Sequence, residues 1–366
     1  MKKIVLVASD IMPSQALQEL NKELSQLSCE VVSFLGFGKG INNAPEIPKI
    51  IASANAVVTG MSTKPKFVEP ELLAINTAIA NGVPFGFYAD TYGVYRRPWF
   101  ENVRGKASFL FVINKEEAVG AKPLFTNAKI VATGNPMWEE FYFPLLSRKE
   151  SRAELDIADN QTLIFCPGAK VLMMNAALFI NTIEAANQLA LMGKNPVVVI
   201  SMHPGDPNPP ETYADLIKYS RVPVKIITRD ILTTSDIVPG ADILVDFCST
   251  TAIEAAHQRI PVINFFTEIQ LGRLEEIIGT REWELNRLGV AEAVYGNAKD
   301  PPQTINRLLT RRDSRQCGSA RKSFIPRRPS KARQSKKWPR QFYRPYSSSI
   351  QAKSNNPRET RSVSLF

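Results

Sequence analysis

Long apolar runs, histidines and clustered cysteines are what this 366-residue sequence lacks. No run of 18 consecutive apolar residues occurs, so the sequence predicts no transmembrane helix. The two histidines and four cysteines show no metal-ligand spacing and no Asp-x-Asp sequence occurs, so we expect neither a metal nor another cofactor. Three of the cysteines lie within or beside apolar runs, which is typical of buried thiols in a reducing cytoplasm.

The N-terminus has a short apolar core that could be taken for a signal peptide. This core runs only from Ile4 to Ala8 and ends at Ser9-Asp10, which is too short for a secretory signal. We therefore predict a first β-strand over residues 3–8 and expect the protein to be cytoplasmic.

The net charge of +10 belongs to the end of the chain. Residues 311–366 carry 16 Lys/Arg and 2 Asp/Glu, whereas the remaining 310 residues carry 29 basic and 33 acidic side chains. Such a tail cannot bury enough apolar surface to fold alone, so we expect it to be disordered. It could instead contact nucleic acid or the surface of an anionic membrane. The abrupt change from a helical pattern at 302–309 favours a third origin, a change of reading frame that replaced the normal ending.

The order of predicted elements alternates strand and helix twice along the chain. The order restarts at Gln161 after an aromatic stretch, which predicts two doubly wound α/β domains with a hinge between about residues 134 and 156. We expect a first domain over 1–136, a linker over 137–155, a second domain over 156–310 and the tail over 311–366. The predicted strands are 3–8, 30–35, 54–60, 84–89, 108–113, 129–132, 161–166, 195–202, 224–227, 241–247 and 261–265.

The stretch 241–265 carries the strongest ligand-binding signal. An apolar run is followed by Ser249, Thr250 and Thr251, then by a short helical pattern and a second apolar run, which predicts a parallel βαβ unit. The hydroxyls follow the carboxyl end of a strand, where open α/β sheets bind ligands, and a helix start suits a phosphate. Glu254, about one turn into the helix, can accept hydrogen bonds from a diol. The alternative is an ordinary N-cap with a surface carboxylate.

Two further turns follow predicted strands in the second half. The backbone N–H groups of Gly168-Ala169-Lys170, together with the lysine, could stabilise the charge that develops on a diphosphate leaving group. His203, in the pair His203-Pro204, could donate to a phosphate or transfer a proton. The alternatives are that Lys170 is only solvated and that His203 is structural.

The first half offers a group of acceptor-side candidates after the strand 84–89. Asp90 at the strand end is the candidate general base for an acceptor hydroxyl, although it could simply cap a turn. Arg96 and Arg97 could bind an anionic acceptor by bidentate hydrogen bonds. The aromatic side chains that could stack on sugar rings are Tyr92, Tyr95 and Trp99.

The motif Thr251-x-x-Glu254-Ala255, followed after a short gap by Pro261-Val262, resembles the nucleotide-sugar motif of GT-B-fold glycosyltransferases and UDP-GlcNAc 2-epimerases. The resemblance implies two Rossmann-like domains that face a cleft. It also implies that the hydroxyl segment holds the diphosphate and that Glu254 holds the ribose hydroxyls. The sequence departs from the motif at Arg259-Ile260, where a glycine normally precedes the proline.

Two shorter motifs support the same resemblance. Gly134-Asn135-Pro136 is similar to the sequence that closes the N-terminal domain of bacterial GT-B enzymes. His203-Pro204 resembles the pair found at a strand end in the epimerases and in some polymer-forming GT-B transferases. The resemblance rests on these motifs and on the order of elements over residues 1–300.

The resemblance favours a metal-independent glycosyltransferase that uses a nucleotide-sugar donor, UDP-linked by expectation. Its acceptor would be a sugar or a lipid-linked molecule, as in the synthesis of cell-envelope polysaccharides. A non-hydrolysing nucleotide-sugar 2-epimerase ranks second, because that reaction needs several acid/base carboxylates and only Asp90 lies in a suitable place. A non-catalytic protein that binds a nucleotide sugar or a nucleic acid is the remaining alternative.

Overall fold

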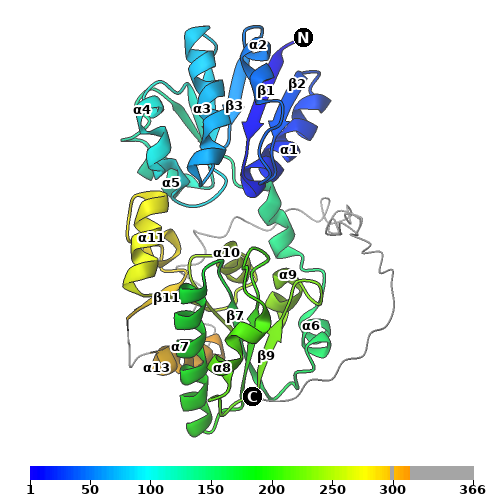
Figure 1. The fold of residues 1–366 in the computed structure, drawn as a ribbon, viewed down its shortest axis with the longest axis vertical. Helices are drawn as coiled ribbons and strands as arrows, with labels where there is room; N and C mark the ends of the chain where they lie inside the picture. The colour runs from blue at the N-terminus through cyan, green and yellow to red at the C-terminus, as the bar shows by residue number, and fades with distance from the viewer. Residues whose placement is uncertain (297–300, 314–366) are drawn as a thin grey trace, which may run out of the picture. The chain divides into compact units, whose positions relative to one another are not determined.

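The computed structural model describes residues 1–296 and 301–313 (Figure 1). The predictions for the tail beyond Asp313, including its disorder, its contacts and its origin, lie outside these residues. Among the helices that the structure describes, none combines the length and the apolar character that a membrane crossing requires.

Two parallel six-stranded sheets form the described part of the chain, with strand orders β2-β1-β3-β4-β5-β6 and β12-β11-β10-β7-β8-β9. The first sheet consists of β1 (Lys3–Ala8), β2 (Glu30–Leu35), β3 (Ala56–Thr59), β4 (Phe85–Tyr88), β5 (Phe109–Val112) and β6 (Lys129–Ala132). The second consists of β7 (Thr162–Pro167), β8 (Pro196–Ser201), β9 (Val224–Ile227), β10 (Ile243–Asp246), β11 (Val262–Phe266) and β12 (Glu292–Tyr295). Each order reverses direction once, beside β1 and beside β7, so both sheets are doubly wound.

Helices connect the strands and cover both faces of each sheet (Figure 1). Those of the first half are α1 (Ile11–Gln26), α2 (Ile47–Ile51), α3 (Pro65–Ala80), α4 (Glu101–Arg104) and α5 (Lys115–Ala121). Those that follow are α6 (Arg148–Glu154), α7 (Leu172–Leu191), α8 (Ala214–Ile217), α9 (Thr234–Ile237), α10 (Thr250–His257), α11 (Glu268–Ile278), α12 (Glu284–Arg287) and α13 (Pro301–Asp313).

The strands are almost continuously apolar because helices bury both of their faces. In β7, Leu163 and Phe165 pack into the core under α10 and α11, whereas Ile164 and Cys166 pack into the opposite core under α7. All four side chains are 0% exposed, so each strand contributes to two cores at once. This two-sided burial explains why short apolar runs identified the strands from the sequence.

The structure confirms the predicted fold class, an α/β protein with two doubly wound parallel sheets. The edge strand β12 was not predicted, because only one of its four residues is buried and it includes Glu292 and the exposed Tyr295. The helix predicted over 302–309 is present as α13. Its described part packs on α7, with Ile305 and Leu308 in a core of the second sheet.

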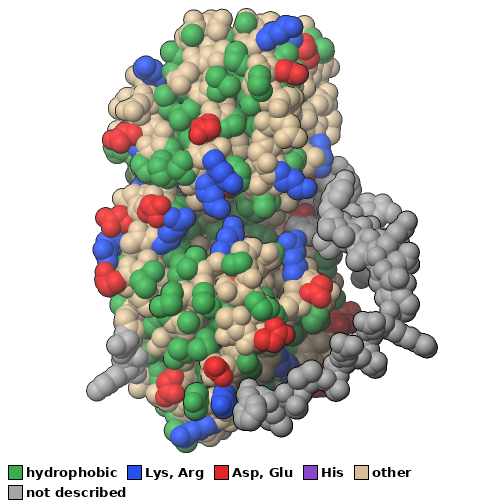
Figure 2. All heavy atoms as spheres, in the orientation of Figure 1, with side chains coloured by type: hydrophobic (Ala, Val, Ile, Leu, Met, Phe, Trp, Pro, Cys, Tyr) green, Lys and Arg blue, Asp and Glu red, His purple; other side chains and the backbone are tan. Residues whose placement is uncertain are grey.

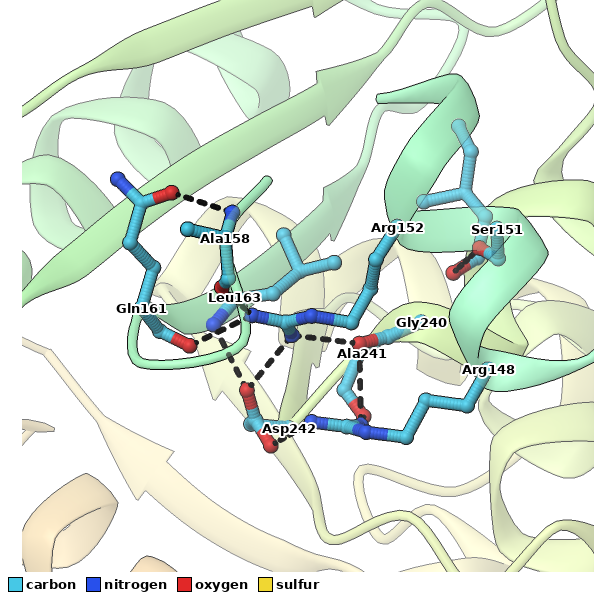
Figure 3. Close-up of polar contacts among 10 residues, drawn as sticks. Arg148, Ser151, Arg152, Ala158, Gln161, Leu163, Gly240, Ala241 and Asp242 are labelled. Carbon is cyan, nitrogen blue, oxygen red and sulfur yellow. Dashed lines mark hydrogen bonds and ion pairs between the residues drawn. The ribbon is translucent and has the colours of Figure 1, made fainter. Parts of the chain in front are cut away.

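Helix α6, which lies inside the predicted linker, is fastened to the second sheet by two arginines (Figure 3). Arg148 and Arg152 both bind the carboxylate of Asp242, at distances of 2.7 and 3.3 Å. The Arg152 guanidinium also donates to the carbonyl oxygens of Gly240, Ala158 and Gln161. Asp242 immediately precedes β10, so α6 is tied to the amino end of a central strand of this sheet.

Candidate functional site

A pocket of about 170 Å³ lies at the carboxyl ends of β7, β8 and β10. The strand order of the second sheet reverses between β7 and β10, and open α/β sheets bind their ligands at such a switch point. The residues that line the pocket are Pro167, Gly168, Ser201, Met202, His203, Pro204, Thr234, Ser249, Thr250 and Thr251. The structure therefore brings together the three loops that the sequence singled out in the second half.

The hydroxyl turn is held from below by a buried carboxylate, Asp246, at the end of β10. The backbone N–H of Ser249 donates to Asp246 at 3.1 Å, and the Ser249 hydroxyl donates to the same oxygen. Asn264 from β11 donates to the other carboxylate oxygen at 2.5 Å. Burial raises the pKa of Asp246 to about 6, against the lowering effect of these hydrogen bonds.

Helix α10 begins at Thr250 with Ser249 as its N-cap residue, but the Ser249 side chain makes no capping hydrogen bond. We expected Ser249 or Thr250 to cap this helix. Ser249 occupies the N-cap position, but its side chain does not cap, because Asp246 binds the hydroxyl instead. The backbone N–H groups of Thr250 and Thr251 have no hydrogen-bond partner among the described residues. Two N–H groups at the positive end of a helix are well suited to an anion.

The Gly168 loop is built differently from our expectation. The N–H of Gly168 donates to Ser201 O at 2.8 Å, and the N–H of Ala169 donates to Asn175 Oδ1 at 2.6 Å. The prediction that these two N–H groups serve a diphosphate is therefore wrong, since each already has a protein acceptor. Lys170 is exposed and close to the Gly205 turn, so it is the group of this loop that can reach an anionic ligand.

His203 follows β8 and is partly buried at the pocket wall. Its Nδ1 accepts a hydrogen bond from the N–H of Gly205 at 2.8 Å. Burial, followed by the nearby charge of Lys170, lowers the pKa of His203 to about 4. At neutral pH the ring is thus uncharged with its proton on Nε2, which favours hydrogen-bond donation over proton transfer for this histidine.

Glu254 lies one turn further along α10 and is only 5% exposed. Its carboxylate accepts from the Ser235 hydroxyl at 3.0 Å and from the Gln258 amide at 3.5 Å. Burial raises the pKa of Glu254 to about 7, while the Ser235 bond acts in the opposite direction. The interpretation of Glu254 as an exposed surface carboxylate is wrong, because its side chain is buried on α10.

No protein-family model matches the chain, and no curated protein matches it. Solved structures do match. The complex of S. aureus MnaA with UDP superposes with a TM-score of 0.60 at 15% identity, over 88% of this chain and 91% of that one. MurG of Acinetobacter baumannii gives 0.54 at 15% identity, with 87% and 92% covered. A UDP-N-acetylglucosamine 2-epimerase gives 0.55 at 14%, with 87% and 90% covered.

The chain has the GT-B fold. At identities this low the match establishes architecture alone, and it confirms the fold that the motifs predicted. Gly134-Asn135-Pro136 follows β6, so this motif does close the first sheet of the GT-B fold. Arg259, at the position where the motif has glycine, adopts a left-handed conformation with φ of 62°.

In the first half of the GT-B fold, Asp90 and Arg97 both follow β4 and interact electrostatically. Both side chains are buried, at 3% and 6% exposure, and the carboxylate Oδ1 of Asp90 has no hydrogen-bond partner among the described residues. Burial raises the pKa of Asp90 to about 6, and the charge of Arg97 opposes that shift. A carboxyl that titrates near neutrality is a suitable proton acceptor.

Other predicted acceptor residues lie elsewhere. Arg96 forms a salt bridge with Glu284 at 3.1 Å, so it is not available to an anionic acceptor in this arrangement. Tyr92 is 1% exposed and stacks on Trp138 with ring centroids 5.3 Å apart. Tyr95 is 0% exposed. The prediction that these two tyrosines stack on sugar rings is wrong, because both rings are buried inside the protein.

Trp99, the third aromatic candidate, is half-buried and packs against the core of the first sheet. Sequence reasoning also missed Glu71, which is 0% exposed on the buried face of α3. Its carboxylate accepts from the N–H groups of Ser9 and Ser62 at 3.2 and 2.9 Å, which ties together the ends of β1 and β3. Burial raises the pKa of Glu71 to about 7. A lone glutamate among the apolar positions of α3 was the signal that could have revealed it.

Proposed function

We propose that this protein is a GT-B nucleotide-sugar enzyme that binds a UDP-sugar in the pocket beside α10. The observation that carries the proposal is the group of anion-binding elements at one switch point. The N–H groups that start α10, the Lys170 ammonium and the Nε2–H of His203 all suit a diphosphate, and buried Glu254 lies one helical turn away. The S. aureus MnaA structure, which has the same fold, contains UDP.

The reaction that we favour is transfer of the sugar to an acceptor hydroxyl. The bond between the sugar and the diphosphate breaks, and the negative charge left on the diphosphate is stabilised by Lys170, His203 and the start of α10. Asp90 takes the proton of the attacking hydroxyl, and Arg97 beside it orients the acceptor, which we propose to be a sugar or a lipid-linked molecule. Asp90→Asn should reduce turnover at least 100-fold while leaving nucleotide affinity unchanged, since general-base catalysis contributes roughly 10²- to 10⁴-fold.

A 2-epimerase is the second candidate. One observation in the structure supports it more strongly than the sequence did. Inverting a carbon centre requires removal of a proton from one face and return from the other, which calls for two acid/base groups. Among the buried carboxyl groups of the first half whose pKa values are raised, Asp90 and Glu71 both lie within the electrostatic reach of Arg97. Glu71 already accepts backbone hydrogen bonds, which is why we rank transfer first.

Calorimetric titration tests the nucleotide site. A charge-assisted hydrogen bond contributes roughly 1.5–3 kcal/mol, so Glu254→Ala should weaken the binding of UDP and UDP-sugars by about 10- to 100-fold. Lys170→Ala should weaken it as well, while Glu254→Gln should fall between wild type and Glu254→Ala. Glu184→Ala on the exposed side of α7 is the matched control and should bind as wild type does. Thermal melts of every variant check that folding is intact.

Product analysis then separates the reactions. Wild type is incubated with UDP-sugars, and either UDP release or sugar interconversion is followed. Release of UDP supports transfer, interconversion supports epimerisation, and binding without either supports a non-catalytic role. If Glu254→Ala binds every nucleotide as tightly as wild type, the ribose assignment is wrong. If wild type binds none of them, the transferase and epimerase proposals both fall.

A further inference from the structure

A buried asparagine at the start of α7 clamps the loop that follows β7. Asn175 is 0% exposed and binds both backbone groups of Ala169. Its Oδ1 accepts from the Ala169 N–H at 2.6 Å, and its Nδ2 donates to the Ala169 carbonyl at 2.9 Å. The position of the Gly168-Ala169-Lys170 loop therefore depends on one side chain that does not line the pocket.

The same asparagine reaches the loop that follows β8. Asn175 Nδ2 lies 2.7 Å from Asp206 Oδ2, and the Tyr213 hydroxyl donates to the same oxygen at 2.6 Å. Asn208 binds the other oxygen of Asp206 through both its backbone and its side chain. Burial alone would raise the pKa of Asp206, but the hydrogen bonds from Tyr213, Asn208 and Asn175 outweigh it and lower that pKa. Asp206 is thus a fixed anion with satisfied oxygens.

Asp206 in turn closes the tight turn that contains His203. Its N–H donates to the His203 carbonyl at 2.9 Å, and inside this turn the Gly205 N–H donates to His203 Nδ1. A backbone N–H can only donate, so Nδ1 must carry a lone pair and the ring proton must sit on Nε2. A side-chain carbon added to Gly205 would lie 3.3 Å from both His203 Nδ1 and Lys170 Cε, so the two loops are in contact here.

We propose that Asn175 and Asp206 are positioning residues. Together they form a bracket that joins the loop after β7 to the loop after β8 and holds His203 as a neutral Nε2–H donor toward the ligand. The proposal rests on the proposed nucleotide site, because it assigns His203 the role of a donor to phosphate and excludes imidazolium chemistry there. The charged groups that face the ring agree with it. Lys170 and Arg229 oppose protonation of His203, and Asp206, which favours it, is occupied by its own three partners.

Nitrogen-15 NMR of the imidazoles tests the bracket without any nucleotide. The chain has two histidines, and His257 serves as an internal reference because its Nδ1 lies 2.7 Å from the Ile253 carbonyl and must be the protonated nitrogen. In wild type at pH 7 we expect His203 to be protonated on Nε2 and His257 on Nδ1. His203 should also stay neutral down to pH 5. In Asn175→Ala, His203 should populate both tautomers and titrate nearer its ordinary pKa of about 6.5.

Asn187→Ala is the matched control, because Asn187 is another buried asparagine of α7 that binds a loop, through Arg221 N at 2.7 Å, at the far end of the helix. It should cost similar thermal stability while leaving the His203 spectrum and nucleotide affinity unchanged. Asn175→Ala should weaken UDP binding by about 10-fold. This is the lower end of the loss of affinity seen when a metal-binding histidine loses the hydrogen-bond partner that orients it. Asp206→Asn, which keeps the shape, should give a smaller change in both measurements.

Two results would overturn the bracket. One is a wild-type His203 that is protonated on Nδ1 or charged at pH 7, and the other is an Asn175→Ala spectrum identical to that of wild type. If wild type binds no UDP, the proposed function is refuted. The NMR spectra would still decide which tautomer His203 adopts and whether that tautomer depends on Asn175. The two failures are therefore distinguishable.

Discussion

The attachment of α6 offers a sharp comparison between two arginines that share one carboxylate. Arg152 is 2% exposed and binds three carbonyl oxygens in addition to Asp242, whereas the Arg148 side chain is 42% exposed. Arg152→Met fills much of the same volume but leaves the part-buried carbonyls of Ala158 and Gln161 without their donor. Asp242 keeps Arg148, so the carboxylate itself does not become an unpaired charge.

The expected losses follow from that difference in burial. Each carbonyl left unsatisfied costs about 1–3 kcal/mol, so Arg152→Met should lower the free energy of unfolding by about 3 kcal/mol. Arg148→Met removes a partly exposed ion pair together with bonds to the carbonyls of Gly240 and Ala241, the first of which keeps Arg152 as a donor. Because solvent screens this site, the loss should be about 1 kcal/mol. Urea unfolding followed by tryptophan fluorescence measures both, because Trp283 is buried in the same core as Leu163 and Leu244 of the second sheet and reports its unfolding.

The double variant provides the control for coupling through Asp242. It should lose more than the sum of the single variants, since Asp242 then retains neither arginine. Equal losses for the two single variants would refute the reasoning, because they would mean that the contacts of buried Arg152 contribute no more than those of the more exposed Arg148. A loss confined to Arg148→Met would refute it as well.

Two further outcomes are expected. Arg259→Gly should raise the free energy of unfolding by about 1 kcal/mol, because Arg259 adopts a left-handed φ of 62° that glycine tolerates better. The N–H groups of Arg259 and Ile260 fix this conformation by binding the carbonyls of Ala256 and Ala255 at the end of α10. Thermal melts measure the gain, and an equal gain in Arg259→Ala, which keeps the strained conformation, would contradict it. UDP-sugar binding should strengthen by roughly 5- to 10-fold between pH 5.5 and 8, because the pKa of Glu254 is raised to about 7 and only the ionised carboxylate makes the charge-assisted bond. In the ligand-free protein the sign is opposite, since the raised pKa contributes stability below pH 4.5 that is lost as the pH rises through 7. Titrations of Glu254→Gln at both pH values should show no such dependence, and a dependence equal to that of wild type would assign it to another group.

The parts of the structure that the sequence predicted are those in which the local pattern determines the result. Burial on both faces made most strands readable as apolar runs, and residues that follow a strand, such as His203 and Ser249, must lie at the carboxyl edge of a parallel sheet. The neighbours Arg96 and Arg97 show where this reasoning ends. One side chain reaches Glu284 and the other is buried near Asp90, a difference that is set by packing and not by the residues themselves.

The errors have the same origin. The N–H groups of Gly168 and Ala169 looked available because their acceptors, Ser201 and Asn175, come from other elements. Tyr92 and Tyr95 looked exposed because aromatic and cationic residues alternate there, yet both rings are inside. Asp246 was passed over because it ends an apolar run, and its partner Asn264 lies 18 residues away. Partners distant in sequence decide which polar groups a ligand can reach.

Strand β10 carries a carboxylate at each end, Asp242 just before it and Asp246 as its last residue. One carboxylate anchors α6 at the amino edge of the sheet, and the other anchors the hydroxyl turn beside the pocket. Four residues of strand, roughly 13 Å of extended chain, therefore connect α6, which follows the first sheet, to the floor of the pocket. A pull on that segment would be transmitted to the same strand on which the pocket floor is built.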